Sequence, residues 1–150
     1  MKKIMSFMLI VFGILAISEA AVFADVEKIV IGSDEMYGCF SKPCTVNPGE
    51  TNLYYNAGFG GKVATVYYFY GRTGDKTFDV RRKSTGTFGE DHIYHYYFVP
   101  NDTVDIQYVG GIGKDMGCGP GDNVLLKFIE LTGNRLTYQI ILPNCLKKLK

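Results

Sequence analysis

The stretch NVLLKFIELTGNRLTYQIIL, residues 123–142, decides the fold class. In its second half, apolar residues recur at every second position and so share one face of a strand: Leu136, Tyr138, Ile140 and Leu142. Residues 123–131 are apolar on both faces, as in a central strand. The intervening Thr132-Gly133-Asn134 predicts a tight turn, so the whole stretch reads as an antiparallel hairpin.

The rest of the chain carries the same kind of pattern. No window keeps the helical spacing of apolar residues over three turns, and short runs rich in Val, Ile, Tyr, Phe and Thr alternate with turn residues. Further strands are expected at 26–31, around Leu53, and at 62–70, 76–82, 92–99 and 103–109, whereas most of 37–56 reads as irregular. We expect an all-β, single-domain antiparallel β-sandwich (jelly-roll or Ig-like) of about seven to eight strands. A small β-barrel is the alternative, because the period of two does not separate these architectures.

The N-terminus has the pattern of a secretory signal peptide. Lys2 and Lys3 precede the apolar stretch Ile4–Ile17, and Val22-Phe23-Ala24 places small residues before a cleavage point. We therefore expect residues 1–24 to be a cleaved signal peptide and residues 25–150 to form one secreted or periplasmic β domain. The apolar stretch is shorter than the ~20 residues of a membrane span, and no second long apolar run predicts a span after cleavage.

The cysteine count predicts two disulfides. All four cysteines lie in the exported part, and an oxidising compartment favours their pairing. Three connectivities are possible; we favour Cys39–Cys44 with Cys118–Cys145, because each closes on its nearer neighbour, and the rival pairs Cys39 with Cys145. A zinc site would need the same thiolates, and the chain has no CxxC spacing. We expect no cofactor and no metal.

The charge balance bears on the class of partner. Without residues 1–24, the chain keeps 14 basic and 14 acidic residues. Nucleic-acid-binding domains are usually strongly basic, so we expect no nucleic-acid partner. The local basic excess in 72–83 and in the C-terminal tail reads as solvated surface. The sequence leaves the oligomeric state open.

The only two histidines lie in EDHIYHYYF, residues 90–98. The spacing of His92 and His95 suits a shared metal on a helix, but in a strand residues three apart point to opposite faces. Glu90 and His92 could share a face, and such a pair can perform general acid–base catalysis. No nucleophile signature accompanies them. A small secreted hydrolase or ribonuclease using Glu90, His92 or His95, with an arginine such as Arg81, is therefore the alternative function.

Tyrosine is the other unusual feature of the composition. The chain has 11 tyrosines, all after the signal peptide. In the strand expected at 92–99, one face carries Tyr94, Tyr96 and Phe98, and the other carries Ile93, His95, Tyr97 and Val99. Because Ile93 and Val99 are aliphatic, we expect the second face to turn to the core and the first to form an exposed aromatic strip. Tyrosine gives a rigid contact with a polar tip, which suits recognition of proteins and sugar rings.

A glycine-rich stretch, GGIGKDMGCGPGD, spans residues 110–122. It lacks the glycine spacing and the Ser or Thr of a phosphate-binding loop, and it lacks the acidic frame of a calcium loop. Gly119-Pro120-Gly121-Asp122 instead predicts a type II turn, with Cys118 anchoring the loop. The untethered half is expected to contact a partner through Ile112, Lys114 and Met116.

Together these features favour a non-catalytic secreted binding module of the inhibitor, adhesin or effector type. Its partner would be an extracellular protein or glycan. The expected contacts are the aromatic strip of Tyr94, Tyr96 and Phe98 and the loop residues Ile112, Lys114 and Met116.

Overall fold

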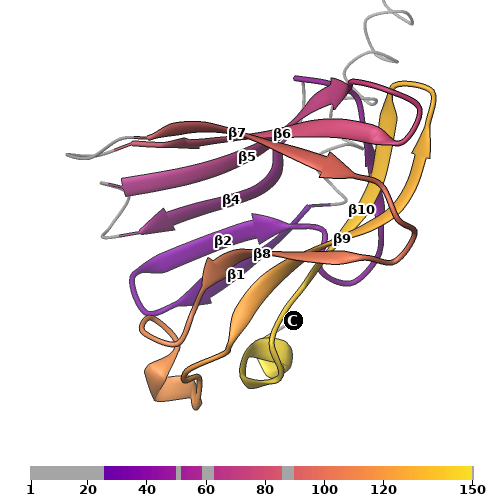
Figure 1. Cartoon of the computed structure of the whole chain (residues 1–150). Helices are drawn as coiled ribbons and strands as arrows, with labels where there is room; N and C mark the ends of the chain where they lie inside the picture. Colours follow the sequence, from indigo (N-terminus) through magenta and orange to yellow (C-terminus); the bar gives the residue numbers. More distant parts are fainter. Residues whose placement is uncertain (1–25, 50–51, 59–62, 86–89, 150) are drawn as a thin grey trace, which may run out of the picture.

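A computed structural model describes residues 26–49, 52–58, 63–85 and 90–149; the expected signal peptide, residues 1–24, lies outside them. The described residues form two antiparallel sheets that pack as a β-sandwich (Figure 1). The six-stranded sheet has the order β1 (Glu27–Ile31), β2 (Asp34–Gly38), β4 (Asn52–Gly58), β5 (Val63–Arg72), β6 (Thr77–Ser84) and β7 (Asp91–Tyr97). The four-stranded sheet has the order β3 (Cys44–Val46), β10 (Arg135–Ile141), β9 (Asn123–Thr132) and β8 (Thr103–Tyr108).

The all-β sandwich is confirmed, but the described residues contain more strands than the sequence suggested. β2 and β3 were not expected as strands, since β2 begins with two acidic residues and ends in glycine, and β3 has only three residues. The residues of β2 have low β propensity and β3 is very short, so pairing decides the outcome. β2 pairs with β1 and β4, and β3 pairs with β10. The irregular reading of residues 37–56 was therefore wrong for β3 and for the end of β2, whereas the strand expected around Leu53 is present as β4.

Turn chemistry sets the register of the hairpins. β9 and β10 pair as expected, and Gly133, the first residue of their turn, has a positive φ of 59°, as a type II′ hairpin turn requires. In the turn after β7, Asn101 has φ 67° and Asp102 N–H donates to the Val99 carbonyl at 3.1 Å. The predicted turn after Cys118 is also present: Gly121 has φ 86°, and Asp122 N–H donates to the Gly119 carbonyl at 3.1 Å.

The core between the sheets is rich in rings. The largest fully buried side chains include Tyr54, Tyr138, Phe40, Phe69, Phe78 and Phe128. Two tyrosine hydroxyls join the sheets: Tyr67 Oη donates to the Ile106 carbonyl of β8 at 2.7 Å, and Tyr54 Oη donates to Gln107 Oε1. These contacts hold β8, the last strand of the small sheet, over β4 and β5.

Both favoured disulfides are present. Cys39 pairs with Cys44, and Cys118 pairs with Cys145, with Cα–Cα distances of 6.1 and 5.3 Å. The second bond ties the glycine-rich loop to the short helix η3 (Asn144–Leu149) at the end of the described chain. Two disulfides are consistent with an oxidising compartment. Among the described residues, no helix has the length and apolar character of a membrane span.

The glycine-rich loop provides a test of this tethered packing. A Cβ at Gly113 would lie 2.7 Å from Cys118 Sγ and 2.9 Å from the Val109 carbonyl oxygen, whereas one at Gly111 meets nothing within 4 Å. We therefore expect Gly113→Ala to lower the free energy of unfolding by about 1–3 kcal/mol, as overpacking does. The exposed control Gly111→Ala should change it by less than about 0.5 kcal/mol. Urea unfolding with both disulfides intact measures the difference, and equal stability of the two variants would contradict the packing.

Candidate functional site

β7 turns its faces the opposite way from the sequence-based expectation. The face predicted to be buried is exposed: Ile93, Tyr97 and Val99 are 39%, 60% and 45% exposed, and the His95 side chain is 79% exposed. The face predicted to be exposed is half-buried and packs against the core: Tyr94, Tyr96 and Phe98. Tyr96 and Phe98 contact the core rings Phe128 and Phe78. Alternation along the strand then places Ile93, Tyr97 and Val99 on the outer face.

The three half-buried rings, here called the aromatic strip, follow the inner face of β7. The Tyr94 ring is nearly parallel to its neighbours on both sides: it lies 6.0 Å from Tyr96 at an interplanar angle of 10° and 6.5 Å from Tyr67 at 18°. Tyr96 also contacts the buried Phe128 at 5.4 Å. The strip is thus held rigidly by the core along one side.

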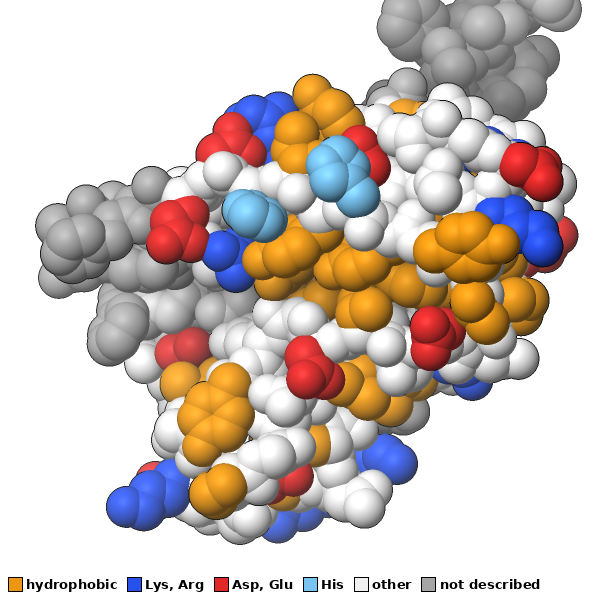
Figure 2. All heavy atoms as spheres, viewed as in Figure 1, with side chains coloured by type: hydrophobic (Ala, Val, Ile, Leu, Met, Phe, Trp, Pro, Cys, Tyr) orange, Lys and Arg blue, Asp and Glu red, His pale blue; other side chains and the backbone are white. Residues whose placement is uncertain are grey.

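The strip lies along the side of the sandwich where the last described strands of the two sheets are not joined. In the described part of the chain, β7 and β8 end their respective sheets and are not hydrogen-bonded to each other. Hydrophobic side chains form a continuous band across this side of the molecule, below the two histidines (Figure 2). The inner side chains of β7 are therefore covered by the core on one side and reach solvent on the other.

Three polar side chains lie at the end of the strip nearest the start of β7: Arg82, Glu90 and His92. Arg82 lies across from His92 in the β6–β7 pairing, and its Nη2 donates to Glu90 Oε2 at 2.6 Å. The Arg82 guanidinium carbon lies 5.7 Å from the centre of the Tyr94 ring, and the His92 ring lies 4.4 Å from the same ring. The structure thus brings Glu90 and His92 together beside an arginine.

This polar group retains an unused donor. Arg82 Nε is buried and has no hydrogen-bond partner, although the Arg82 side chain as a whole is 26% exposed. A buried polar atom without a partner is unusual and needs an explanation, such as a water molecule or a bound ligand. Because this atom is buried, a ligand on the surface of the strip does not reach it.

The arginine named from the sequence is on the other side of the sheet. Arg81 binds Asp91 and lies over the exposed Tyr70, 5.6 Å from the ring centre. His95 is on this outer face too, where its Nδ1 lies 2.7 Å from Asp79 Oδ1. His92 and His95 thus face opposite ways, as expected for a strand. Arg82 could have been found from the sequence, since it shares its face with the buried Phe78 and Val80.

The loop residues predicted to bind are not brought to the strip. Ile112 is 38% exposed and Lys114 is exposed, whereas Met116 is half-buried and packs against the core. The loop and its short helix η2 (Lys114–Met116) lie beyond the end of β8, well apart from β7 (Figure 1). The two predicted contact regions are therefore separate surfaces.

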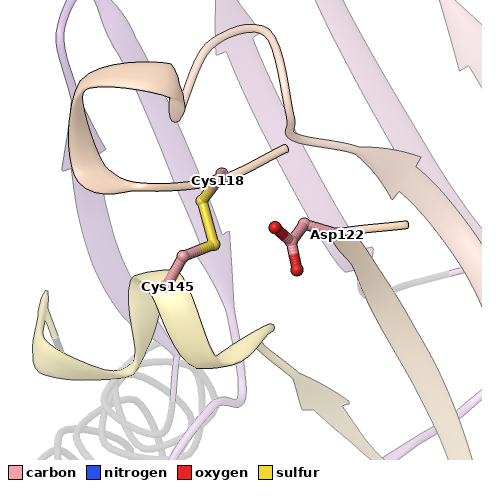
Figure 3. A group of neighbouring side chains, drawn as sticks. All are labelled: Cys118, Asp122 and Cys145. Carbon is pink, nitrogen blue, oxygen red and sulfur yellow. A yellow bond between two sulfur atoms is a disulfide. The ribbon is translucent and has the colours of Figure 1, made fainter. Parts of the chain in front are cut away.

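A possible metal-binding group within the described residues consists of Cys118, Asp122 and Cys145, whose ligand atoms lie within 4.8 Å of one another (Figure 3). The two sulfurs are bonded to each other, so neither offers the thiolate that zinc binds. One carboxylate oxygen of Asp122 accepts a hydrogen bond from Gly119 N–H at 2.8 Å. The group therefore serves to close the loop.

Burial changes the ionisation of Tyr96, which gives a direct test. Burial raises the pKa of Tyr96 from 10.0 to about 12. Between these values the unfolded chain has lost a proton that the folded protein keeps, so the free energy of unfolding falls as pH rises through this range. Tyr96→Phe should make that fall less steep. Urea unfolding at several alkaline pH values measures it, and the other buried tyrosines are common to both proteins. Identical pH dependence would show that Tyr96 is solvated.

The site therefore combines a rigid aromatic strip with an Arg–Glu pair and a histidine at one end. Comparisons of the chain with protein-family models, with curated proteins and with solved structures found no match.

Proposed function

We propose that this protein is a secreted, non-catalytic binding module that recognises an extracellular glycan along the aromatic strip. The observation that carries the proposal is the open, rigid row of Tyr94, Tyr96 and Phe98, ended by the Arg82–Glu90 pair. Binding sites for small molecules typically combine an apolar, aromatic lining with a few placed polar groups. Export with cleavage of residues 1–24 remains part of the proposal.

The aromatic part suits sugar rings. The C–H face of a pyranose is apolar and packs on tyrosine, while the phenol hydroxyl remains available for hydrogen bonds. Since Tyr94 and Tyr96 are nearly parallel and backed by the core, little side-chain entropy is lost when a ligand binds. A preorganised strip of this kind supports affinity without a deep cavity.

The polar end suits hydroxyl groups. A carboxylate accepts hydrogen bonds and a guanidinium donates them, so the Arg82–Glu90 pair can engage neighbouring hydroxyls of one sugar. The two charges cancel, which favours a neutral ligand over an anion.

A hydrolase or ribonuclease is the second candidate, and one observation favours it: Glu90, His92 and Arg82 are adjacent. Against it, Glu90 is held by Arg82 and is 65% exposed, whereas a general base benefits from a burial-shifted environment. His95, on the outer face, does not join this group.

The strip can be tested with a matched pair of variants. Tyr94→Ala removes the central ring of the strip, so we expect the affinity for bound glycans to fall about tenfold or more. Tyr97→Ala, on the outer face of the same strand, should leave it unchanged. Glycan-array screening followed by calorimetry on the best ligands measures both. Equal affinity of the two variants, or binding to extracellular proteins alone, would contradict the proposal.

The histidines separate a binder from an enzyme. The double variant His92→Ala, His95→Ala should bind glycans only modestly more weakly, because neither ring belongs to the strip. For a binding module, neither the wild type nor the double variant should turn over a substrate. Release of reducing sugar or of nucleotides from glycan and RNA substrates is the measurement. Turnover by the wild-type protein that disappears in the double variant would establish the hydrolase instead.

The loop reports on the size of the ligand. Ile112→Ser with Lys114→Ser alters a surface separate from β7 (Figure 1), so a short glycan bound on the strip should be unaffected. Loss of binding in this variant would instead require a partner large enough to span both surfaces, as an extracellular protein is. Titration of the same ligand against the loop variant and Tyr94→Ala distinguishes the two cases.

A further inference from the structure

β7 is an edge strand whose outer backbone groups have no partner among the described residues. Its bonds to β6 involve every second residue. Ser84 N–H donates to the Glu90 carbonyl at 2.7 Å and Phe98 N–H donates to the Lys76 carbonyl at 2.6 Å, one at each end of the strand. In an antiparallel pair the bonded positions alternate, so the N–H and C=O groups of the odd-numbered residues 91–97 point away from the sheet.

The other edges carry features that discourage strand addition, and β7 does not. β1 has an exposed lysine, Lys28, in an ion pair with Glu35; β3 has three residues; and β8 is irregular between Asp105 and Gln107. Lysines, short strands and bulges are the usual protections of an edge. β7 has seven residues, contains no Lys, Arg, Pro or Gly, and pairs with β6 without a register shift.

We propose that β7 pairs antiparallel with β7 of a second copy of this chain. Two copies related by a twofold axis at Tyr94 would pair Ile93 with His95 of the second copy and Asp91 with Tyr97 of the second copy. These are the outward-pointing positions, so the seam would hold about eight backbone hydrogen bonds. A twofold axis makes the two contributions identical, as in most homodimers.

The side chains at this seam are self-complementary. On the outer face, Ile93 and Tyr97 are large, apolar and exposed, at 39% and 60%, and pairing would cover both. Asp91, the one carboxylate of β7, already binds Arg81, and in this register it faces a phenol. No two like charges are opposed, so the seam tolerates a copy of itself.

On the inner face, Tyr94 would meet Tyr94 of the second copy, and the two aromatic strips would become continuous. This consequence rests on the proposed function, whereas the pairing itself does not. The dimer would present a glycan surface of twice the length, with an Arg82–Glu90 pair on each side.

Proline substitutions at two edges test the pairing. Ile93→Pro removes an outward N–H that β6 does not use, and edge positions of this kind tolerate proline. Val30→Pro is the matched control: it is 52% exposed on β1 at the opposite edge of the same sheet, and its N–H also points outward, because Ile29 and Ile31 bond to β2. Sedimentation equilibrium of the disulfide-bonded, exported chain, without ligand, measures the dimer.

We expect the wild type and Val30→Pro to be dimeric near about 100 μM, and Ile93→Pro to raise the dissociation constant at least about tenfold. In the wild type, amide exchange at Ile93 and His95 should slow as concentration rises. If Ile93→Pro fails to fold by near-ultraviolet circular dichroism, Ile93→Lys replaces it, because an edge lysine also blocks pairing. A wild type that stays monomeric, or a dimer that both Ile93 variants leave intact, overturns the proposal. Glycan binding by a monomer would leave the proposed function standing.

Discussion

Two tyrosine hydroxyls determine how the sheets of this sandwich meet. Tyr67 and Tyr54 lie in the core, yet their hydroxyls reach the Ile106 carbonyl and the Gln107 side chain of β8. A buried hydroxyl without a partner would be costly, so these bonds fix where the last strand of the small sheet must run. Because β8 stops over β4 and β5, no strand of that sheet within the described residues covers β7, and its inner rings remain at the open side.

The position of β8 also explains why the surface along the inner side of β7 is aromatic. Tyr96 of β7 reaches Phe128 of the other sheet across the edge of the core, with the ring centres 5.4 Å apart. A tyrosine in that position keeps its body on the core and its hydroxyl in water, since both ends then find suitable surroundings. The half-buried state of Tyr94 and Tyr96 is thus a packing requirement, because the core fixes their ring planes.

Much of the fold could be predicted from the sequence, because period-two alternation and turn residues are local signals. The hairpin at 123–142, the Gly119–Asp122 turn and both disulfides are as expected. The faces of β7 were not, because alternation identifies which residues share a face but not which face meets the core. Tyr94 and Ile93 are both plausible core residues, and contacts remote in sequence decide between them: the Tyr94 ring packs on Tyr67, and the Tyr96 ring beside it packs on Phe128. The short strand β3 depends in the same way on a partner remote in sequence, β10.

The position of Arg82 follows from the same alternation of side chains along a strand. On β6, alternation with Phe78 and Val80 carries it to the inner face, where the core would ordinarily exclude a charge. Four features make it tolerable there: the hydroxyl of Tyr67, the Glu90 carboxylate, the face of Tyr94, and the solvent that reaches 26% of its side chain. Leucine at this position would avoid the cost of desolvating a charge, but it would leave Glu90 without its ion pair. The charged pair and the half-buried rings are therefore parts of one packing arrangement, joined through the face of Tyr94.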